Sequence, residues 1–74
     1  KVSIKTQLDQ AIVNVTPDLF GGEIAVVDMA GKEVKVVTIN DVNTTVTYEG
    51  IEVGIYMLSA RFEGGLISKK VYVR

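Results

Sequence analysis

The sequence contains no cysteine and no histidine, and it has only one proline among its 74 residues. Without cysteine no disulfide can form, and without cysteine and histidine the Cys₂His₂ and Cys₄ zinc sites are excluded. Ser-His-Asp and Cys-His catalysis are excluded as well, because their general base is absent from the chain. No apolar run approaches the ~20 residues of a membrane-spanning helix. The net charge of -1 argues against the basic field that nucleic-acid binding needs, so no nucleic-acid partner is expected.

β-Branched residues dominate what is present. Val, Ile and Thr make up 26 of the 74 residues, whereas Leu and Ala contribute only four each. Branched side chains suit a pleated strand better than a helix, and the apolar residues alternate with polar ones at period two. This pattern predicts an all-β fold, a seven-stranded antiparallel immunoglobulin-like β-sandwich. The predicted strands are 2–6, 11–15, 24–29, 34–39, 44–48, 55–62 and 66–73, and the loop 16–22, which holds the proline, joins the sheets.

Two hairpins carry specific turn chemistry. Asp28 and Gly31 suit the first and fourth positions of a type I turn, with Gly31 in the left-handed conformation of a bulge. This turn predicts the pairs Asp28 with Lys32, Val26 with Val34, and Ile24 with Val36. Gly64 and Gly65 predict a second, two-residue turn, because glycine accepts the positive φ of primed turns. Its predicted pairs are Phe62 with Ile67, Ala60 with Lys69, Leu58 with Val71, and Tyr56 with Val73.

These registers together predict which residues face the core. The predicted inner face comprises Val26, Val34, Val36, Tyr56, Leu58, Ala60, Phe62, Val71 and Val73. Lys70 is predicted on the outer face, whereas Lys69 points inward and can reach solvent only through its ammonium, by snorkelling.

Carboxylates are the only candidate acids or bases in the chain. We interpret them as turn-forming and solubilising charges, because a domain of this size leaves little room for a catalytic cleft. The acidic turn 40–43 lacks the glycine and the distal bidentate Glu of an EF-hand loop. We therefore expect no catalytic residue, no metal and no cofactor.

Three short segments follow one another in order toward the end of the chain. Residues 28–34 read DMAGKEV, residues 54–58 read GIYML, and residues 69–74 read KKVYVR. The set resembles the D-L-x-G-[KR]-x-V, G-x-Y-x-L and K-K-[IV]-x-[VK]-[RK] motifs of the type A C-terminal sorting domains of bacterial type IX secretion systems. The resemblance covers residues 23–74, with Met29 in place of the usual Leu. The family's Y-P-N-P-type opening is missing here, so residues 1–22 are predicted from alternation alone.

The resemblance implies a non-enzymatic address carried by an exported cargo protein. It implies recognition by an outer-membrane translocon and its shuttle proteins, usually followed by removal by a cell-surface sortase. The protein would then be exported through the periplasm to the outer membrane, the cell surface or the extracellular space. We expect residues 1–74 to be a single sorting domain, a fragment of a longer secreted protein.

Two sets of residues carry the resemblance. In the recognition hairpin, Lys69, Lys70 and Arg74 are expected to contact the machinery, while Gly54, Tyr56 and Leu58 hold the hairpin's shape. The full sets are the recognition hairpin Gly54, Tyr56, Leu58, Lys69, Lys70, Val71 and Arg74, and the family hairpin motif Asp28, Gly31 and Lys32.

Two other function classes stay open on the sequence alone. One is an immunoglobulin-like structural or adhesive module, carbohydrate-binding for example, of a surface protein. The other is a hydrolase fragment, which the lack of His, Cys and a cleft disfavours. A terminal address should not tolerate the loss of its last residues, whereas a structural module should. The unpaired strand edges of a sandwich also leave a homodimer open.

Overall fold

The computed structural model describes residues 2–74, which form seven strands and one short helix. The strands are β1 (Val2–Thr6), β2 (Gln10–Val15), β3 (Glu23–Asp28), β4 (Glu33–Thr38), β5 (Asn43–Thr47), β6 (Gly54–Phe62) and β7 (Gly65–Val73). The helix η1 (Pro17–Leu19) is a single 3₁₀ turn inside the predicted inter-sheet loop. All seven predicted strands are confirmed. The described part of the chain contains no helix with the length and apolar character that a membrane crossing requires.

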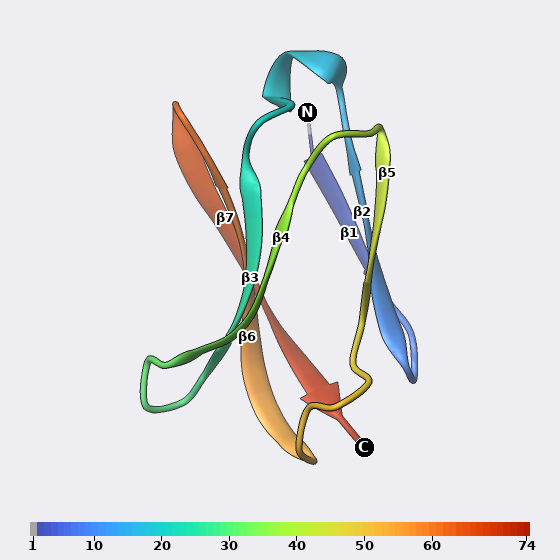
Figure 1. Cartoon of the computed structure of the whole chain (residues 1–74), viewed down its shortest axis with the longest axis vertical. Helices are drawn as coiled ribbons and strands as arrows, with labels where there is room; N and C mark the ends of the chain where they lie inside the picture. The colour runs from blue at the N-terminus through green and yellow to red at the C-terminus, as the bar shows by residue number, and fades with distance from the viewer. Residues whose placement is uncertain (1) are drawn as a thin grey trace.

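The strands form two antiparallel sheets that face each other (Figure 1). One sheet has the order β1-β2-β5 and the other β4-β3-β6-β7. The fourth strand therefore lies beside the third, on the sheet that also contains the C-terminal hairpin. This division of seven short antiparallel strands between two layers confirms the predicted β-sandwich.

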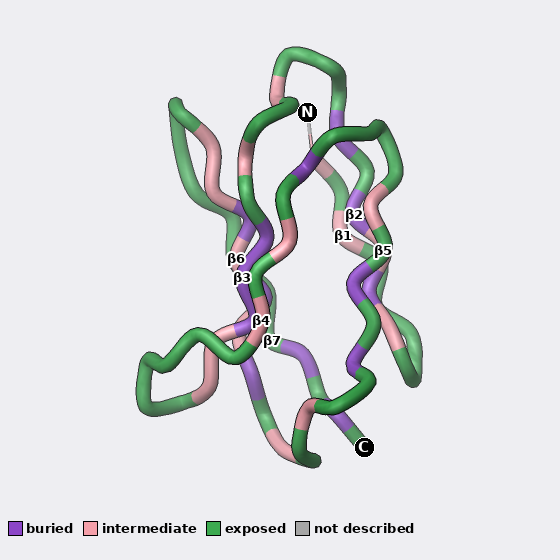
Figure 2. The backbone as a smooth tube through the Cα atoms, in the orientation of Figure 1, coloured by how far each residue is buried: buried purple, intermediate pink, exposed green. Residues whose placement is uncertain are grey.

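The core lies between the two sheets, where buried segments of both layers face one another (Figure 2). The largest fully buried side chains are Val13, Ile24, Val26, Ile39, Val46, Leu58 and Val71. Tyr48 and Tyr56 belong to the same cluster, and Phe62 is half-buried against it. Because successive strand residues point to opposite faces, each strand contributes alternate residues to this core.

The β3–β4 hairpin contains a bulge that the sequence did not reveal. Val26 pairs with Lys35 and Val27 pairs with Glu33, so Val34 is an extra residue on β4. An extra residue reverses the face of every residue beyond it. The prediction that Val34 and Val36 face the core is therefore wrong, and these side chains are 39% and 44% exposed. The predicted pairs Val26 with Val34 and Ile24 with Val36 are wrong for the same reason.

The β6–β7 hairpin is shifted by two residues from its predicted register. Leu58 pairs with Lys69 rather than Val71, and Phe62 pairs with Gly65, so Glu63 and Gly64 form the turn. Neither Gly64 nor Gly65 has the positive φ that we predicted. A shift of two residues preserves the alternation of faces. The predicted inner positions of Val71 and Val73 are therefore confirmed even though their partners are wrong.

Candidate recognition surface

The β6–β7 hairpin is anchored in the core by alternate residues of its two strands. Tyr56, Leu58 and Val71 are only 7%, 0% and 2% exposed. These three residues of the predicted recognition set therefore contribute packing. Gly54 begins β6 without a positive φ. A Cβ at Gly54 would lie 3.6 Å from a carbon of the Tyr56 ring, which is ordinary contact, so the backbone does not require glycine there.

Tyr56 has a second role besides packing. Its hydroxyl donates a hydrogen bond of 2.7 Å to the backbone carbonyl of Glu52. Glu52 lies in the connection between β5 and β6, so this bond ties the connection to the strand that follows it. This hydrogen bond satisfies the hydroxyl and favours tyrosine over phenylalanine at this position.

The turn between β3 and β4 explains the other family motif. Asp28 Oδ1 accepts hydrogen bonds from the backbone N–H groups of Ala30 and Lys32, both at 2.9 Å. The Gly31 N–H donates to the Asp28 carbonyl at 3.0 Å, and Gly31 has a φ of +90°. The predicted turn and the left-handed glycine are thus confirmed. Asp28 and Gly31 shape the turn, while the Lys32 side chain is exposed.

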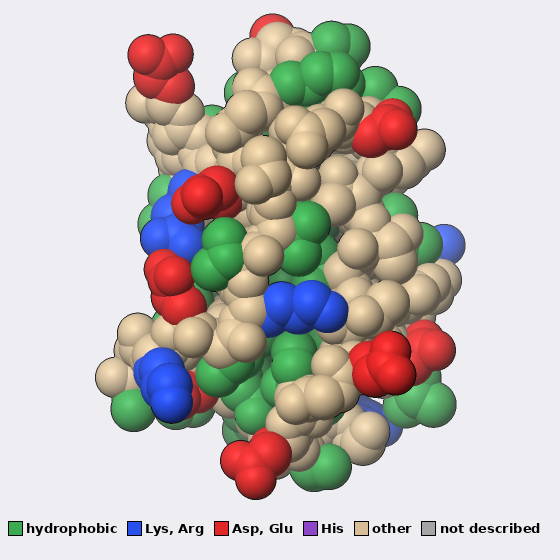
Figure 3. Space-filling view, in the orientation of Figure 1, with side chains coloured by type: hydrophobic (Ala, Val, Ile, Leu, Met, Phe, Trp, Pro, Cys, Tyr) green, Lys and Arg blue, Asp and Glu red, His purple; other side chains and the backbone are tan. Residues whose placement is uncertain are grey.

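Two lysines bridge the open sides of the sandwich. Lys69 on β7 points inward, and its ammonium donates to the Ile4 carbonyl on β1 at 3.3 Å. On the opposite side, Lys35 on β4 donates to the backbone carbonyl and the hydroxyl of Thr47, at 2.7 and 3.1 Å. Figure 3 views the molecule from this second side, with β4 and β5 in front. Each lysine therefore links one edge strand to the edge strand of the other sheet.

The remaining cations of the terminal strand are oriented differently. Lys70 lies opposite Met57, is exposed as predicted, and its ammonium has no hydrogen bond or ion pair with another residue of 2–74. By contrast, Arg61 on the neighbouring strand is paired with Glu33 at 2.7 Å. Arg74 is exposed as well. The end of β7 thus presents positive charge to solvent, whereas Lys69 is held by β1.

The four sheet edges differ in how well they could accept another strand. β1 and β5 have five residues each, and β4 has six and carries the bulge at Val34. β7 has nine residues and pairs with β6 in a continuous register. Short strands, bulges and inward charges blunt an edge against further pairing. β7 carries one inward charge, Lys69, and its ammonium is held by the Ile4 carbonyl. Within residues 2–74, β7 is the long, regular edge.

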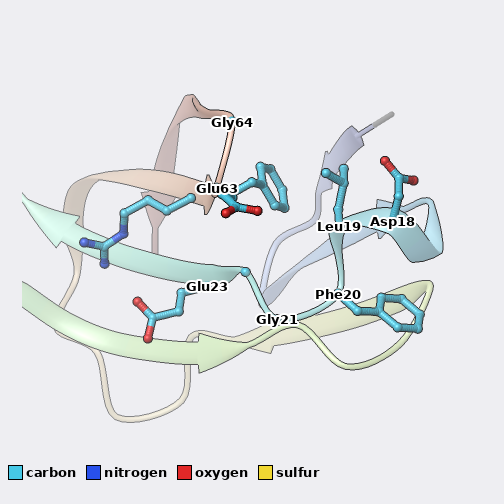
Figure 4. Close-up of a pocket in the computed structure, with 10 residues that line it drawn as sticks. Asp18, Leu19, Phe20, Gly21, Glu23, Glu63 and Gly64 are labelled. Carbon is cyan, nitrogen blue, oxygen red and sulfur yellow. The ribbon is translucent and has the colours of Figure 1, made fainter.

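A hollow of about 600 Å³ separates the turn of this hairpin from the loop 16–22. Figure 4 shows Leu19 of the loop across from Glu63 and Gly64 of the turn. A second hollow, of about 410 Å³, adjoins the first and shares Leu19, Phe62 and Gly64 with it. A hydrogen bond from the Thr16 side chain lowers the pKa of Asp18, which lines the first hollow.

Gly22 brings the loop into contact with the hairpin. A Cβ at this position would lie 2.6 Å from the Arg61 carbonyl oxygen and 2.6 Å from a ring carbon of Phe62. Glycine is therefore needed for close approach. Gly22 lies in the predicted loop 16–22, but this close approach was not predicted; the paired glycines at positions 21 and 22 are the available signal.

A match to one known protein family covers the whole described part of the chain. Residues 2–74 match the family described as the secretion system C-terminal sorting domain. The chain belongs to this family. No curated protein and no solved structure matches it. The match confirms the resemblance to the sorting-domain family over residues 23–74, and it extends family membership to the first strands, where the Y-P-N-P-type opening is missing.

A sorting domain of type IX secretion cargo is a signal and not a catalyst. It directs export across the outer membrane, and it does so by interacting with the secretion machinery. Within residues 2–74, no three acidic side chains lie close enough together to hold a metal ion. The terminal hairpin presents exposed cations and an unpaired strand edge.

Proposed function

We propose that the machinery reads this sorting domain mainly through the terminal hairpin, residues 54–74. The observation that carries the proposal is the contrast within β7, where Lys70 is free and exposed beside a lysine held by β1. Lys70 and Arg74 supply the contact charges. Tyr56, Leu58 and Val71 hold the strand that presents them.

The readers we propose are the outer-membrane translocon and its shuttle protein, followed by the cell-surface sortase. Exposed cations at the end of a nearly neutral domain would steer it toward an acidic receptor surface, since complementary charge raises the rate of encounter. The three motifs support assignment to the type A group. We further propose that residues 1–74 form one sorting domain of a longer secreted protein, delivered to the cell surface.

The test is export of a periplasmic reporter fused to the domain in a type IX-competent cell. Deleting residues 70–74 is a poor test, because it also removes Val71 and Val73, which are 2% and 4% exposed. Point changes on the exposed side separate recognition from folding, since exposed charges contribute little to stability. Lys70→Ala and Arg74→Ala are the test variants.

The matched control is Lys5→Ala, an exposed lysine on β1 of the other sheet. We expect the double variant Lys70→Ala/Arg74→Ala to melt like the parent domain and to deliver several-fold less reporter to the cell surface. The control should deliver the normal amount. Normal delivery by the double variant would refute the assignment of the contact residues.

A further inference from the structure

We propose that β7 takes up an extended segment of a secretion-machinery protein as an added strand of the four-stranded sheet. The segment would place an apolar side chain in the hollow beside Ile67 and an acidic side chain beside Lys70. This inference rests on the proposed function, because it specifies how the terminal hairpin is read. In this mode of recognition, backbone hydrogen bonds supply affinity and side-chain pockets supply specificity.

Alternate residues of β7 have backbone N–H and C=O groups that do not pair with β6. The two-residue turn makes Phe62 and Gly65 a hydrogen-bonded pair, and pairing alternates from there along an antiparallel ladder. Ser59 and Ser68 then form a non-hydrogen-bonded pair, consistent with the 3.1 Å between their hydroxyl oxygens. The even-numbered residues of β7 therefore direct their backbone N–H and C=O groups away from β6. These residues are Leu66, Ser68, Lys70 and Tyr72.

The hairpin tip supplies an apolar pocket beside this edge. All residues from 65 to 70 are exposed, although Ile67 and Lys69 lie on the inner side of the sheet. The 410 Å³ hollow lies here and is lined mainly by apolar side chains. Those side chains are Val2, Leu19, Phe62, Leu66 and Ile67. Ile67 is 43% exposed, so a partner side chain opposite it would cover apolar surface that the domain leaves open.

The lysines of β7 favour pairing with a different protein over pairing with a second copy of this chain. Two copies pairing through antiparallel β7 strands would bring Lys69 and Lys70 of each toward those of the other, and like charges across a strand pair are destabilising. An acidic residue beside Lys70 is favourable, and Glu63 at the turn would repel it from the tip. In the added strand, the residues that pair with Ile67 and Lys70 are three positions apart, so their side chains lie on opposite faces of the sheet. The partner segment is thus extended, with an apolar and an acidic residue at that spacing.

The experiment removes one outward N–H from β7. Ser68→Pro deletes it without touching the bonds to β6, since proline is tolerated at an edge whose N–H faces solvent. Ser68→Ala is the control, because it removes the hydroxyl and keeps the N–H. We expect Ser68→Pro to fold, shown by slow amide exchange in β6, and to lose at least ten-fold in reporter export, while Ser68→Ala exports normally. Normal export by folded Ser68→Pro, or an equal loss in Ser68→Ala, would overturn the proposal.

A direct measurement covers the case in which Ser68→Pro does not fold. The probes are two nine-residue peptides of alternating Thr and Val that carry either Glu or Lys and, three positions later, a Leu, which is the order that an antiparallel added strand places opposite Lys70 and Ile67. Added to the unmodified domain, the Glu peptide should slow amide exchange at Leu66, Ser68, Lys70 and Tyr72, and the Lys peptide should not. Absence of protection, equal protection by both peptides, or protection in the free domain from self-pairing would overturn the proposal.

The two proposals fail separately. Normal export by Lys70→Ala/Arg74→Ala contradicts the contact residues of the proposed function, whatever Ser68→Pro does. Loss of export in that double variant together with normal export by Ser68→Pro leaves the proposed function standing. That result would show that the hairpin is read through its side chains and not by strand addition.

Discussion

Replacing Gly22 with alanine tests whether the loop 16–22 must lie against the terminal hairpin. The new Cβ would stand 2.6 Å from the Arg61 carbonyl oxygen, whereas favourable contacts between heavy atoms lie near 3.5–4.0 Å. The carbonyl belongs to the paired strand β6 and cannot turn aside, so the loop must move. Overpacking of this kind costs about 1–3 kcal/mol. A chain of 74 residues has a total stability of only about 4–11 kcal/mol.

The assay is thermal unfolding of the isolated chain, followed by circular dichroism. For a domain of this size each kcal/mol shifts the melting temperature by about 4–8 °C, so Gly22→Ala should lower it by roughly 4–24 °C. The matched control is Gly64→Ala, because a Cβ there meets nothing within 4 Å and its φ is not positive. If Gly22→Ala melted with the parent, or if Gly64→Ala lost as much, the close-approach argument would be wrong.

Three further predictions concern the core, the two buried tyrosines and the acidic turn. Leu58→Ala should lose ~2–5 kcal/mol in urea unfolding, because Leu58 is fully buried. Tyr56→Phe should lose ~1 kcal/mol with its hydrogen bond, whereas Tyr48→Phe should be neutral or stabilising, since the buried Tyr48 hydroxyl has no partner within residues 2–74. Burial raises the pKa of Tyr48, so stability should fall as pH rises above the ordinary tyrosine pKa, and less steeply in Tyr48→Phe. Millimolar calcium should leave the NMR signals of Asp41 unshifted; saturable shifts would contradict the absence of a metal site.

The sequence alone determined the fold class, the strands and most of the faces. Alternation at period two is a local property, so it identified Tyr56, Leu58 and Val71 as core residues without any knowledge of their partners. The Asp28–Gly31 turn was equally predictable, because its hydrogen bonds all lie within five residues. The three ordered motifs, at residues 28–34, 54–58 and 69–74, were together sufficient to identify the sorting family that the chain matches.

Register and long-range contacts were decided only by the tertiary structure. A slip of two residues leaves the alternation unchanged, so the sequence could not distinguish Val71 from Lys69 as the partner of Leu58. The extra residue at Val34 reverses the faces of β4 beyond it. This bulge was not predicted, because it has no local sequence signal. The Lys69 contact to Ile4 joins residues 65 positions apart, and the need for Gly22 arises from the Arg61 backbone passing beside it. Such contacts depend on where the two sheets meet, which local pattern does not encode.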